Sequence, residues 1–152
     1  MPCHAAISQK RVTASPNDTV EQVMKLAAKN KVSNIPILDE SGKLLGVFSL
    51  KVLLKNLIPV SVVMDSGLQM DIKVSAAPGV AKRLAKVKPL PVSEIMERKF
   101  NTVEPDAPLW EGVSQLTKHG SPVVVMDSFG KFAGIMTYNS LVAALEEMND
   151  SD

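Results

Sequence analysis

The sequence is poor in several residue types, and each shortage excludes a class of protein. A single cysteine, Cys3, excludes an intrachain disulfide and favours a reducing compartment. Aromatic residues make up only 4% of the chain, and the formal net charge is +1. Stacking platforms for bases and a general attraction to nucleic acid or anionic lipid are therefore not expected. We expect a soluble, cytoplasmic protein with neither nucleic acid nor membrane as a partner.

Long apolar runs are missing as well. The most apolar stretch, residues 44–64, is interrupted by Lys51, Lys55 and Pro59. A helix that crosses a membrane needs ~20 consecutive and mainly apolar residues, and this stretch is too broken to supply them. With 45% hydrophobic and 22% charged residues, the composition is that of a globular protein. The length suits one ordinary domain or two small ones.

Side chains that could perform catalysis are scarce. His119 precedes Gly120 at the end of a predicted helix, where the helix dipole favours an imidazolium ion, so we interpret it as structural. His4 stands beside Cys3, but no further residues at the spacing of a zinc site accompany the pair. No Walker loop, G-x-S-x-G or H-E-x-x-H motif occurs. The sequence therefore predicts no enzyme, no metal site and no required cofactor.

What the chain does contain is one short motif, twice. Residues 42–49 read GKLLGVFS and residues 130–137 read GKFAGIMT, 88 positions later (130 − 42 = 88). Before each motif comes a short apolar run and an acidic turn ending in glycine, which is typical of a β-hairpin. Each motif ends in a hydroxyl residue suited to cap a helix, Ser49 or Thr137, and apolar residues at helical spacing follow. The motif thus predicts strand, turn, strand and helix in both halves of the chain.

A second correspondence lies upstream, with an offset of 89 residues. Residues 12–30 match residues 101–119, so that Thr13 pairs with Thr102 (102 − 13 = 89). Each segment is typical of a short strand, a turn containing proline and an amphipathic helix. Together the two correspondences predict an α+β fold made of two β-α-β-β-α repeats. We assign residues 1–58 to the first repeat, 59–91 to a helical insert or linker, and 92–152 to the second repeat.

The insert contains a predicted helix, residues 78–88, that begins at a proline. Its apolar residues, among them Leu84 and Val87, fall on one face, and basic residues cover the other. Two interpretations of the basic side stay open: a solvated surface, or a wall that faces a phosphate group or an acidic partner. The basic residues concerned are Lys82, Arg83, Lys86 and Lys88.

The repeated pattern resembles the CBS domain, which is named from cystathionine β-synthase. The likeness rests on T-V-x-P before the first helix, on D-x-x-G-K-h-x-G-h-h-[ST] (h, apolar) in the hairpin, and on V-x-x-I-M at residues 92–96. It covers roughly residues 5–58 and 92–148. The resemblance implies two repeats packed as a pseudo-twofold pair with two clefts, and a regulatory module rather than an enzyme. It also implies a homodimer formed through the helices that follow the hairpins.

Trp110, near the start of a predicted helix, is interpreted as a packing residue.

The resemblance further implies which residues would hold a ligand. The family binds adenosyl ligands through the backbone of the first strand and apolar hairpin residues, with a hydroxyl and helix amides near phosphate. Transferred position by position, the first cleft would use Thr13, Ala14, Ile35, Pro36, Ser49 and Lys51. The second would use Thr102, Val103, Val123, Val124, Thr137, Asn139 and Ser140.

The sequence departs from the family pattern at one informative position. Where the family has an aspartate for the ribose diol, this chain has Val52 in the first repeat and Ser140 in the second. Valine accepts no hydrogen bond, and serine cannot form the charge-assisted pair of a carboxylate. The second cleft is therefore the better candidate, with Thr137 and Asn139 near the phosphate. Ser49 and Thr137 are also expected as N-caps, a structural role that is compatible with binding.

Two functions remain open. A regulatory module that binds an adenosine-type ligand (AMP, ADP, ATP or S-adenosylmethionine) would signal through a change in the arrangement of its repeats. The alternative is a scaffold or interaction protein that has kept the fold and lost the ligand, and the missing aspartate supports it. The sequence names neither the ligand nor a protein partner.

Overall fold

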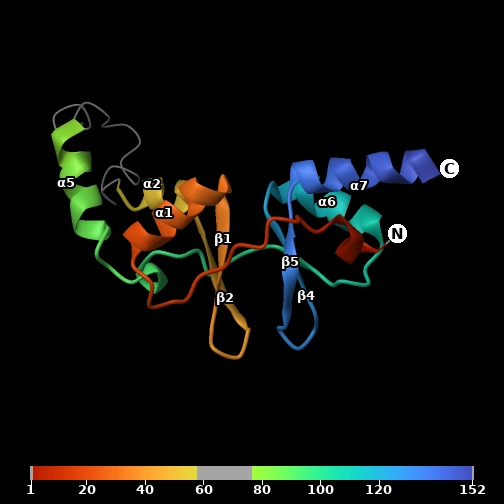
Figure 1. Cartoon of the computed structure of the whole chain (residues 1–152), viewed down its shortest axis with the longest axis horizontal. Coiled ribbons are helices and arrows are strands. Elements are labelled where there is room, and N and C mark those ends of the chain that lie inside the picture. Colours follow the sequence, from red (N-terminus) through yellow and green to blue (C-terminus); the bar gives the residue numbers. More distant parts are fainter. Residues whose placement is uncertain (1, 58–76, 152) are drawn as a thin grey trace.

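The computed structural model describes residues 2–57 and 77–151. Two halves lie side by side, each with a β-hairpin that points down and helices above it (Figure 1). The first half contains α1 (Val20–Asn30), β1 (Asn34–Leu38), β2 (Leu44–Ser49) and α2 (Leu50–Lys55). The second contains β3 (Thr102–Val103), α6 (Leu109–His119), β4 (Val123–Met126), β5 (Phe132–Met136) and α7 (Tyr138–Ser151). The predicted α+β fold of two repeats is confirmed.

Between the two halves the chain forms α5 (Ala77–Val87), and two short 3-10 helices, η1 (Cys3–Ala6) and η2 (Val92–Glu94), precede the repeats. The predicted insert helix is thus present, beginning and ending one residue earlier than expected. Residues 59–76 of the predicted insert lie outside the described residues. Val87 of α5 is buried in the core of the first half, and Leu84 packs against that core. The predicted apolar face of α5 therefore packs against the first half.

The two sheets follow the same plan. β1 pairs with β2 and β4 with β5, both antiparallel, and each hairpin has its irregularity at the same place in the repeat. In the second half β3 adds a parallel strand, in which Val103 lies opposite Val125. In the first half the equivalent pairing shrinks to a single parallel bridge between Ala14 and Ile37. The strand predicted near residue 13 is therefore only a bridge.

The acidic turn of each hairpin shows why the D-x-x-G-K motif occurs twice. Asp39 Oδ1 accepts hydrogen bonds from the Ser41 hydroxyl at 2.7 Å and from the backbone N–H groups of Ser41 and Lys43, each at 2.9 Å. Asp127 accepts the equivalent backbone bond from Lys131, also at 2.9 Å. The Ser41 hydroxyl and these backbone donors lower the pKa of Asp39. A carboxylate that closes the turn and a glycine of positive φ (89° at Gly42) thus make the hairpin.

The segments that precede the two repeats are exchanged between the halves. The N-terminal segment crosses to the second half: Cys3 N–H donates to Ala107 O and Ser8 N–H donates to Ile135 O, both at 2.8 Å. The segment around η2 lies on the first half, where Val47 and Glu97 exchange two backbone hydrogen bonds of 2.9 Å. Figure 1 shows the N-terminus beside α6 and α7, far from α1. Each half is thus completed by the segment in front of the other repeat.

This exchange explains the second glycine of the repeated motif. A Cβ atom at Gly46 would lie 2.8 Å from Met96 Cγ and 2.9 Å from Glu97 O. At the equivalent position, Gly134, a Cβ atom would collide with Ile7. Both contacts are closer than real Cβ atoms allow, so the crossing segments require glycine at these positions.

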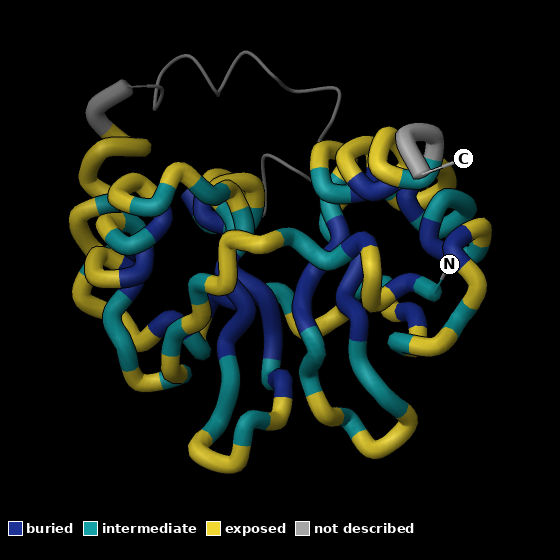
Figure 2. Tube along the Cα trace, turned by 45° about the vertical axis from the view of Figure 1, so that its right-hand side comes forward, coloured by how far each residue is buried: buried dark blue, intermediate teal, exposed yellow. Residues whose placement is uncertain are grey.

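Each half has its own apolar core, and a third cluster joins the halves. Buried residues lie where the strands meet the helices (Figure 2). In α1 the residues Val20, Val23 and Ala27 are buried, as expected of an amphipathic helix. The joining cluster consists of Leu44, Val47, Val124 and Ile135, with Phe100 and Phe132 among the residues packed against it.

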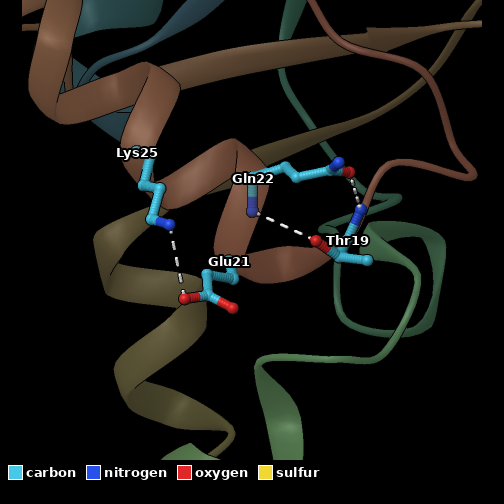
Figure 3. A network of polar contacts seen from close by, with 4 residues as sticks. All are labelled: Thr19, Glu21, Gln22 and Lys25. Carbon is cyan, nitrogen blue, oxygen red and sulfur yellow. Dashed lines mark hydrogen bonds and ion pairs between the residues drawn. The ribbon is translucent and has the colours of Figure 1, made fainter.

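The first helices of the two repeats begin differently. Thr19 Oγ1 accepts from Gln22 N at 3.1 Å and Gln22 Oε1 accepts from Thr19 N at 2.9 Å, which is a capping box (Figure 3). Glu21 also pairs with Lys25 at 3.6 Å. In the second repeat α6 follows Pro108 with no side-chain cap. At the position of Glu21 it carries Trp110, which is 66% exposed, so the expectation that this tryptophan packs within the chain is wrong.

Candidate ligand-binding cleft

A cavity of about 1010 Å³ opens between the two repeats. It is bordered by the starts of α2 and α7, by the chain just before β1 and β4, and by the segments that cross between the halves. Its walls therefore come from both repeats in corresponding places. The lining residues fall within 5–10, 31–34, 47–55, 97–101, 119–122 and 135–147.

A hydroxyl caps the helix on each side of this cleft. Ser49 Oγ accepts from Val52 N at 3.1 Å, and Thr137 Oγ1 accepts from Ser140 N at 3.1 Å. The expected N-cap roles of Ser49 and Thr137 are thus confirmed. In the described part of the chain neither hydroxyl donates its own proton, so both protons are available to an acceptor in the cleft.

The two positions that lack the ribose aspartate differ in their surroundings. Val52 lines the cleft and offers no polar side-chain atom. Ser140 Oγ accepts from Thr137 N at 2.8 Å and donates to Thr137 O at 3.1 Å. Its only proton is therefore donated to the Thr137 carbonyl, and a ligand would have to compete for it. Both positions are poorly suited to bind a sugar diol.

Positive charge surrounds the cleft. The lining includes five lysines and two glutamates, Glu97 and Glu147, so that the lysines exceed the glutamates by three (5 − 2 = 3). Within residues 2–57 and 77–151 the one ion pair is that of Lys25 and Glu21 on α1, outside the cleft. In the described residues the lysines of the cleft thus form no ion pair, and their excess over the two glutamates favours anions. These lysines are Lys10, Lys31, Lys51, Lys55 and Lys99.

The cleft gathers five of the residues expected to contact a ligand: Ser49, Lys51, Thr137, Asn139 and Ser140. A smaller hollow of about 250 Å³, next to Arg11 and Gly134, contains Thr13 and Pro36. The remaining six expected residues line neither space. Three of them, Ile35, Val123 and Val124, are completely buried in the cores, Val103 is 7% exposed, and the other two are Ala14 and Thr102.

Other residues that line the cleft were not predicted from the sequence. Lys10 and Lys99 reach the cleft from the crossing segments, just before the first strand of each repeat. They occupy equivalent positions (99 − 10 = 89), as do Ser33 and Ser121 in the loops before β1 and β4 (121 − 33 = 88). Tyr138 is a further lining residue. The equivalence of Lys10 and Lys99 in the sequence could have marked them as candidate site residues. Both reach the same cleft only because their segments cross between the halves.

The side chains around the smaller hollow do not follow the repeat. Arg11 borders it and donates from Nη1 to Ala133 O at 3.4 Å. The equivalent residue of the second repeat is Phe100 (100 − 11 = 89), which packs against the cluster that joins the halves. The pseudo-twofold relation therefore holds for the backbone and fails for this side chain.

Two other kinds of site were tested. In the described residues no group of three or more His, Cys, Asp or Glu side chains could hold a metal ion. The same part of the chain has no helix that is long and apolar enough to cross a membrane.

Burial raises the pKa of the Cys3 thiol, which donates to Pro108 O at 3.5 Å.

The two pseudo-symmetric repeats, with a basic cleft between them, define a paired-repeat module. The family profile of the CBS domain matches residues 5–59 and 92–147, which is more than half of the chain. The chain therefore belongs to the CBS-domain family, and the suspected resemblance is confirmed.

Known relatives are distant. An uncharacterised protein of Methanocaldococcus jannaschii is 25% identical over 151 residues, 91% of this chain and 88% of that protein. The A-adding tRNA nucleotidyltransferase of Aquifex aeolicus is 26% identical over 130 residues, 85% of this chain. The chain spans only 12% of that enzyme's length.

Solved structures share the fold. The CBS-pair protein CBSX2 of Arabidopsis thaliana superposes with a TM-score of 0.74 at 19% identity, covering 98% of this chain and 96% of that one. CBSX2 in complex with AMP gives 0.71 at 20% identity, covering 97% and 98%. The CBS domain pair of protein MJ0100, in complex with 5-methylthioadenosine and S-adenosyl-L-methionine, gives 0.66 at 23% identity, also covering 97% and 98%.

Proposed function

We propose that the protein is a non-catalytic regulatory module that binds an adenosine-type ligand in the cleft between its repeats. The observation that carries the proposal is the cleft itself, which has five lysines, two capping hydroxyls with free protons, and walls from both repeats. The AMP complex of CBSX2 and the 5-methylthioadenosine and S-adenosyl-L-methionine complex of the MJ0100 pair support this ligand class.

The charge of the cleft favours the phosphate-bearing members of the class. AMP, ADP and ATP are anions, whereas the sulfonium and ammonium groups of S-adenosylmethionine outweigh its single carboxylate. The excess of lysines over glutamates stabilises the former and repels the latter. With Val52 and Ser140 at the ribose positions, we expect recognition through phosphate rather than through the sugar hydroxyls. The residues proposed to face the phosphate are Thr137, Asn139, Lys51 and Lys99.

Signalling would follow from the position of the ligand between the repeats. Lys51 lies on α2 of the first repeat, whereas Asn139 lies on α7 of the second. The joining cluster has four buried members, compared with twelve and ten in the cores of the two halves. A ligand that contacts both walls would favour one relative arrangement of the halves, and a partner would read that arrangement. We also propose a homodimer and a cytoplasmic location, as the sequence indicated.

A scaffold without ligand is the second candidate. Two observations favour it: the Ser140 hydroxyl already donates its proton to Thr137 O, and Val52 has no polar side-chain atom. In this case the basic cleft would contact an acidic protein partner instead of a nucleotide.

Thermal unfolding tests the proposal, with AMP, ADP, ATP and S-adenosylmethionine added with and without magnesium. A ligand at about 100 times its Kd stabilises by about 2.7 kcal/mol, which is roughly a 5–10 °C rise in Tm at this chain length. The double variant Lys51→Ala/Lys99→Ala should lose most of the shift. The control Lys29→Ala/Lys118→Ala, which removes two exposed lysines outside the cleft, should keep it. Unchanged unfolding at millimolar nucleotide would contradict ligand binding and favour the scaffold.

A further inference from the structure

The helices of the two halves differ in charge. α1, α2 and α5, at one end of the molecule (Figure 1), contain seven lysine or arginine residues and one acidic residue, Glu21, which pairs with Lys25. α6 and α7, at the other end, contain one lysine, Lys118, and four acidic residues. The net charge of +1 for the whole chain therefore conceals a basic end and an acidic end.

Five basic residues of α2 and α5 form one band at the basic end. Lys51 and Lys55 of α2 stand four residues apart, on one side of the helix, and both line the cleft. Arg83 Nε donates at 3.1 Å to the backbone oxygen of Asn56, the residue after Lys55, so the basic group of α5 begins where α2 ends. We call these residues the basic band; its members are Lys51, Lys55, Lys82, Arg83 and Lys86.

The basic band forms no ion pair within residues 2–57 and 77–151, where Lys25 and Glu21 make the one pair present. All five of its residues are exposed. Glu97 and Glu147 line the same cleft, but they come from the segment before β3 and from α7, and neither α2 nor α5 has an acidic residue. Like charges held close together are unfavourable, and an anionic partner would relieve their repulsion.

The basic band belongs to the first repeat alone. The residues equivalent to Lys51 and Lys55 are Asn139 and Ala143, since 139 − 51 and 143 − 55 both equal 88. α7, which carries both, has no basic residue at all. An anionic partner is therefore expected on the side of α2 and α5, and the other side of the cleft offers no second band.

We propose that an extended acidic segment of a partner protein binds along the basic band, from α5 into the cleft. A lipid bilayer presents a broad surface, which cannot follow the two lysines of α2 into a cavity. Single-stranded nucleic acid is held largely by stacking on aromatic side chains, and neither α2 nor α5 contains one. A chain of carboxylates needs neither a flat surface nor a stacking platform, and it complements the five positive charges.

The acidic segment and a nucleotide would compete for the cleft. Lys51 is a member of the basic band and is also proposed to face the phosphate, so the competition rests on the proposed function, whereas the contact with α5 does not. A nucleotide that engages Lys51 removes one cation from the acidic segment. Each ligand then weakens the binding of the other by the same factor. Release of the acidic segment would be the signal that the nucleotide is bound.

Fluorescence anisotropy of a labelled oligoglutamate peptide, added to the full chain without nucleotide, tests the basic band by itself. We expect saturable binding that weakens as NaCl is raised from about 50 mM to about 500 mM. Lys82→Glu/Lys86→Glu keeps Arg83 and its bond to α2, and should weaken binding on the order of tenfold. Lys43→Glu/Lys131→Glu is the matched control, because it makes the same change of charge at exposed residues of the hairpins, and should change binding little. Absence of binding at low salt, or equal weakening in both variants, overturns the proposal.

Other anions test the kind of partner. Phosphatidylserine vesicles and an oligothymidylate are compared with the peptide on the unmodified chain, so this comparison remains decisive if a variant fails to fold. Both should bind more weakly than the peptide. Tighter binding of the vesicles or of the oligonucleotide overturns the acidic protein segment in favour of a membrane or a nucleic acid.

ATP separates this proposal from the proposed function. It should raise the dissociation constant of the peptide more than NaCl does at the same ionic strength, and Lys82→Glu/Lys86→Glu should leave the affinity for ATP largely unchanged. If ATP binds and the dissociation constant of the peptide stays the same, the competition at Lys51 is overturned. If ATP does not bind but the peptide does, the proposed function fails and the acidic segment on the basic band is supported.

Discussion

The first repeat begins α1 with a capping box between Thr19 and Gln22, whereas the second begins α6 behind Pro108, with no side-chain cap and an exposed Trp110. The two hairpins, in contrast, share the same carboxylate-closed turn and the same irregularity of register. The turn and the register that shape the hairpins are therefore the same in both copies of the repeat. The helix starts and some surface and cleft positions differ between the copies.

The cleft shows the same contrast. Ser49 and Thr137 both cap a helix and both line the cleft. Two positions further on, Lys51 of the first repeat corresponds to Asn139 of the second, and the ribose positions hold Val52 and Ser140. A ligand would therefore meet two equivalent backbones with different chemistry, so we expect the two sides to contribute unequally to binding.

The largest effect is expected where the repeats are most alike. Gly46→Ala should destabilise the protein by about 2–3 kcal/mol, because the new Cβ atom would lie 2.8 Å from Met96 Cγ and 2.9 Å from the backbone oxygen of Glu97. Gly134→Ala should cost at least as much, since it meets Ile7 and also has a φ of +157°. Urea denaturation measures both changes.

Gly42→Ala is the control for these variants. It has a φ of +89° but open space around the new atom, so only the conformational cost of about 1 kcal/mol should appear. If Gly46→Ala costs no more than Gly42→Ala, the crossing segment is not packed closely against β2.

A smaller effect is expected at the helix start that the repeats do not share. Thr19→Ala removes the side-chain oxygen that accepts from Gln22 N at 3.1 Å, and should cost about 1 kcal/mol. Thr19→Ser keeps that oxygen and should cost much less. Equal losses for the two variants, measured by denaturation, would show that the methyl group and not the cap stabilises α1.

The smallest effect at neutral pH is expected from Cys3→Val, which copies the equivalent residue Val92 (92 − 3 = 89) into the second half. Burial raises the pKa of the folded Cys3 thiol, so the folded state holds its proton at a pH where the unfolded chain releases it. The stability that the thiol contributes is therefore complete below its ordinary pKa and is lost as the pH rises above it.

The two proteins should thus differ little at pH 7 and diverge above about pH 9. Stability curves from pH 7 to pH 10.5 test this, with the wild type falling more steeply than Cys3→Val. Parallel curves would show that Cys3 is solvated in the folded state.

Much of the fold could be predicted from local signals. The turn aspartates Asp39 and Asp127 and the caps Ser49 and Thr137 act on their own neighbours, so their spacing alone locates the hairpins and helices. The exchange of the N-terminal and η2 segments could not be predicted. Spacing along the chain does not tell which of two equivalent cores receives Cys3 or Val92.

The candidate site was less predictable for the same reason. Helix starts identify Ser49 and Thr137, but Lys10 and Lys99 enter the cleft only because their segments cross between the halves. Residues transferred from the first strands and hairpins, such as Ile35 and Val124, are buried in the cores, and their side chains do not reach the cleft. The position of a residue within its repeat thus predicts its backbone conformation. Whether its side chain is accessible depends on how the other repeat packs against it.

The central claim is that the cleft between the repeats binds an anionic adenosine ligand, and isothermal titration of ATP and AMP into the purified chain tests it most directly. The account predicts saturable binding that weakens at least tenfold in Lys51→Ala/Lys99→Ala and is unchanged in Lys29→Ala/Lys118→Ala, since a charge-assisted hydrogen bond contributes about 1.5–3 kcal/mol. Binding that is absent at millimolar nucleotide, or equally strong in both double variants, would contradict it.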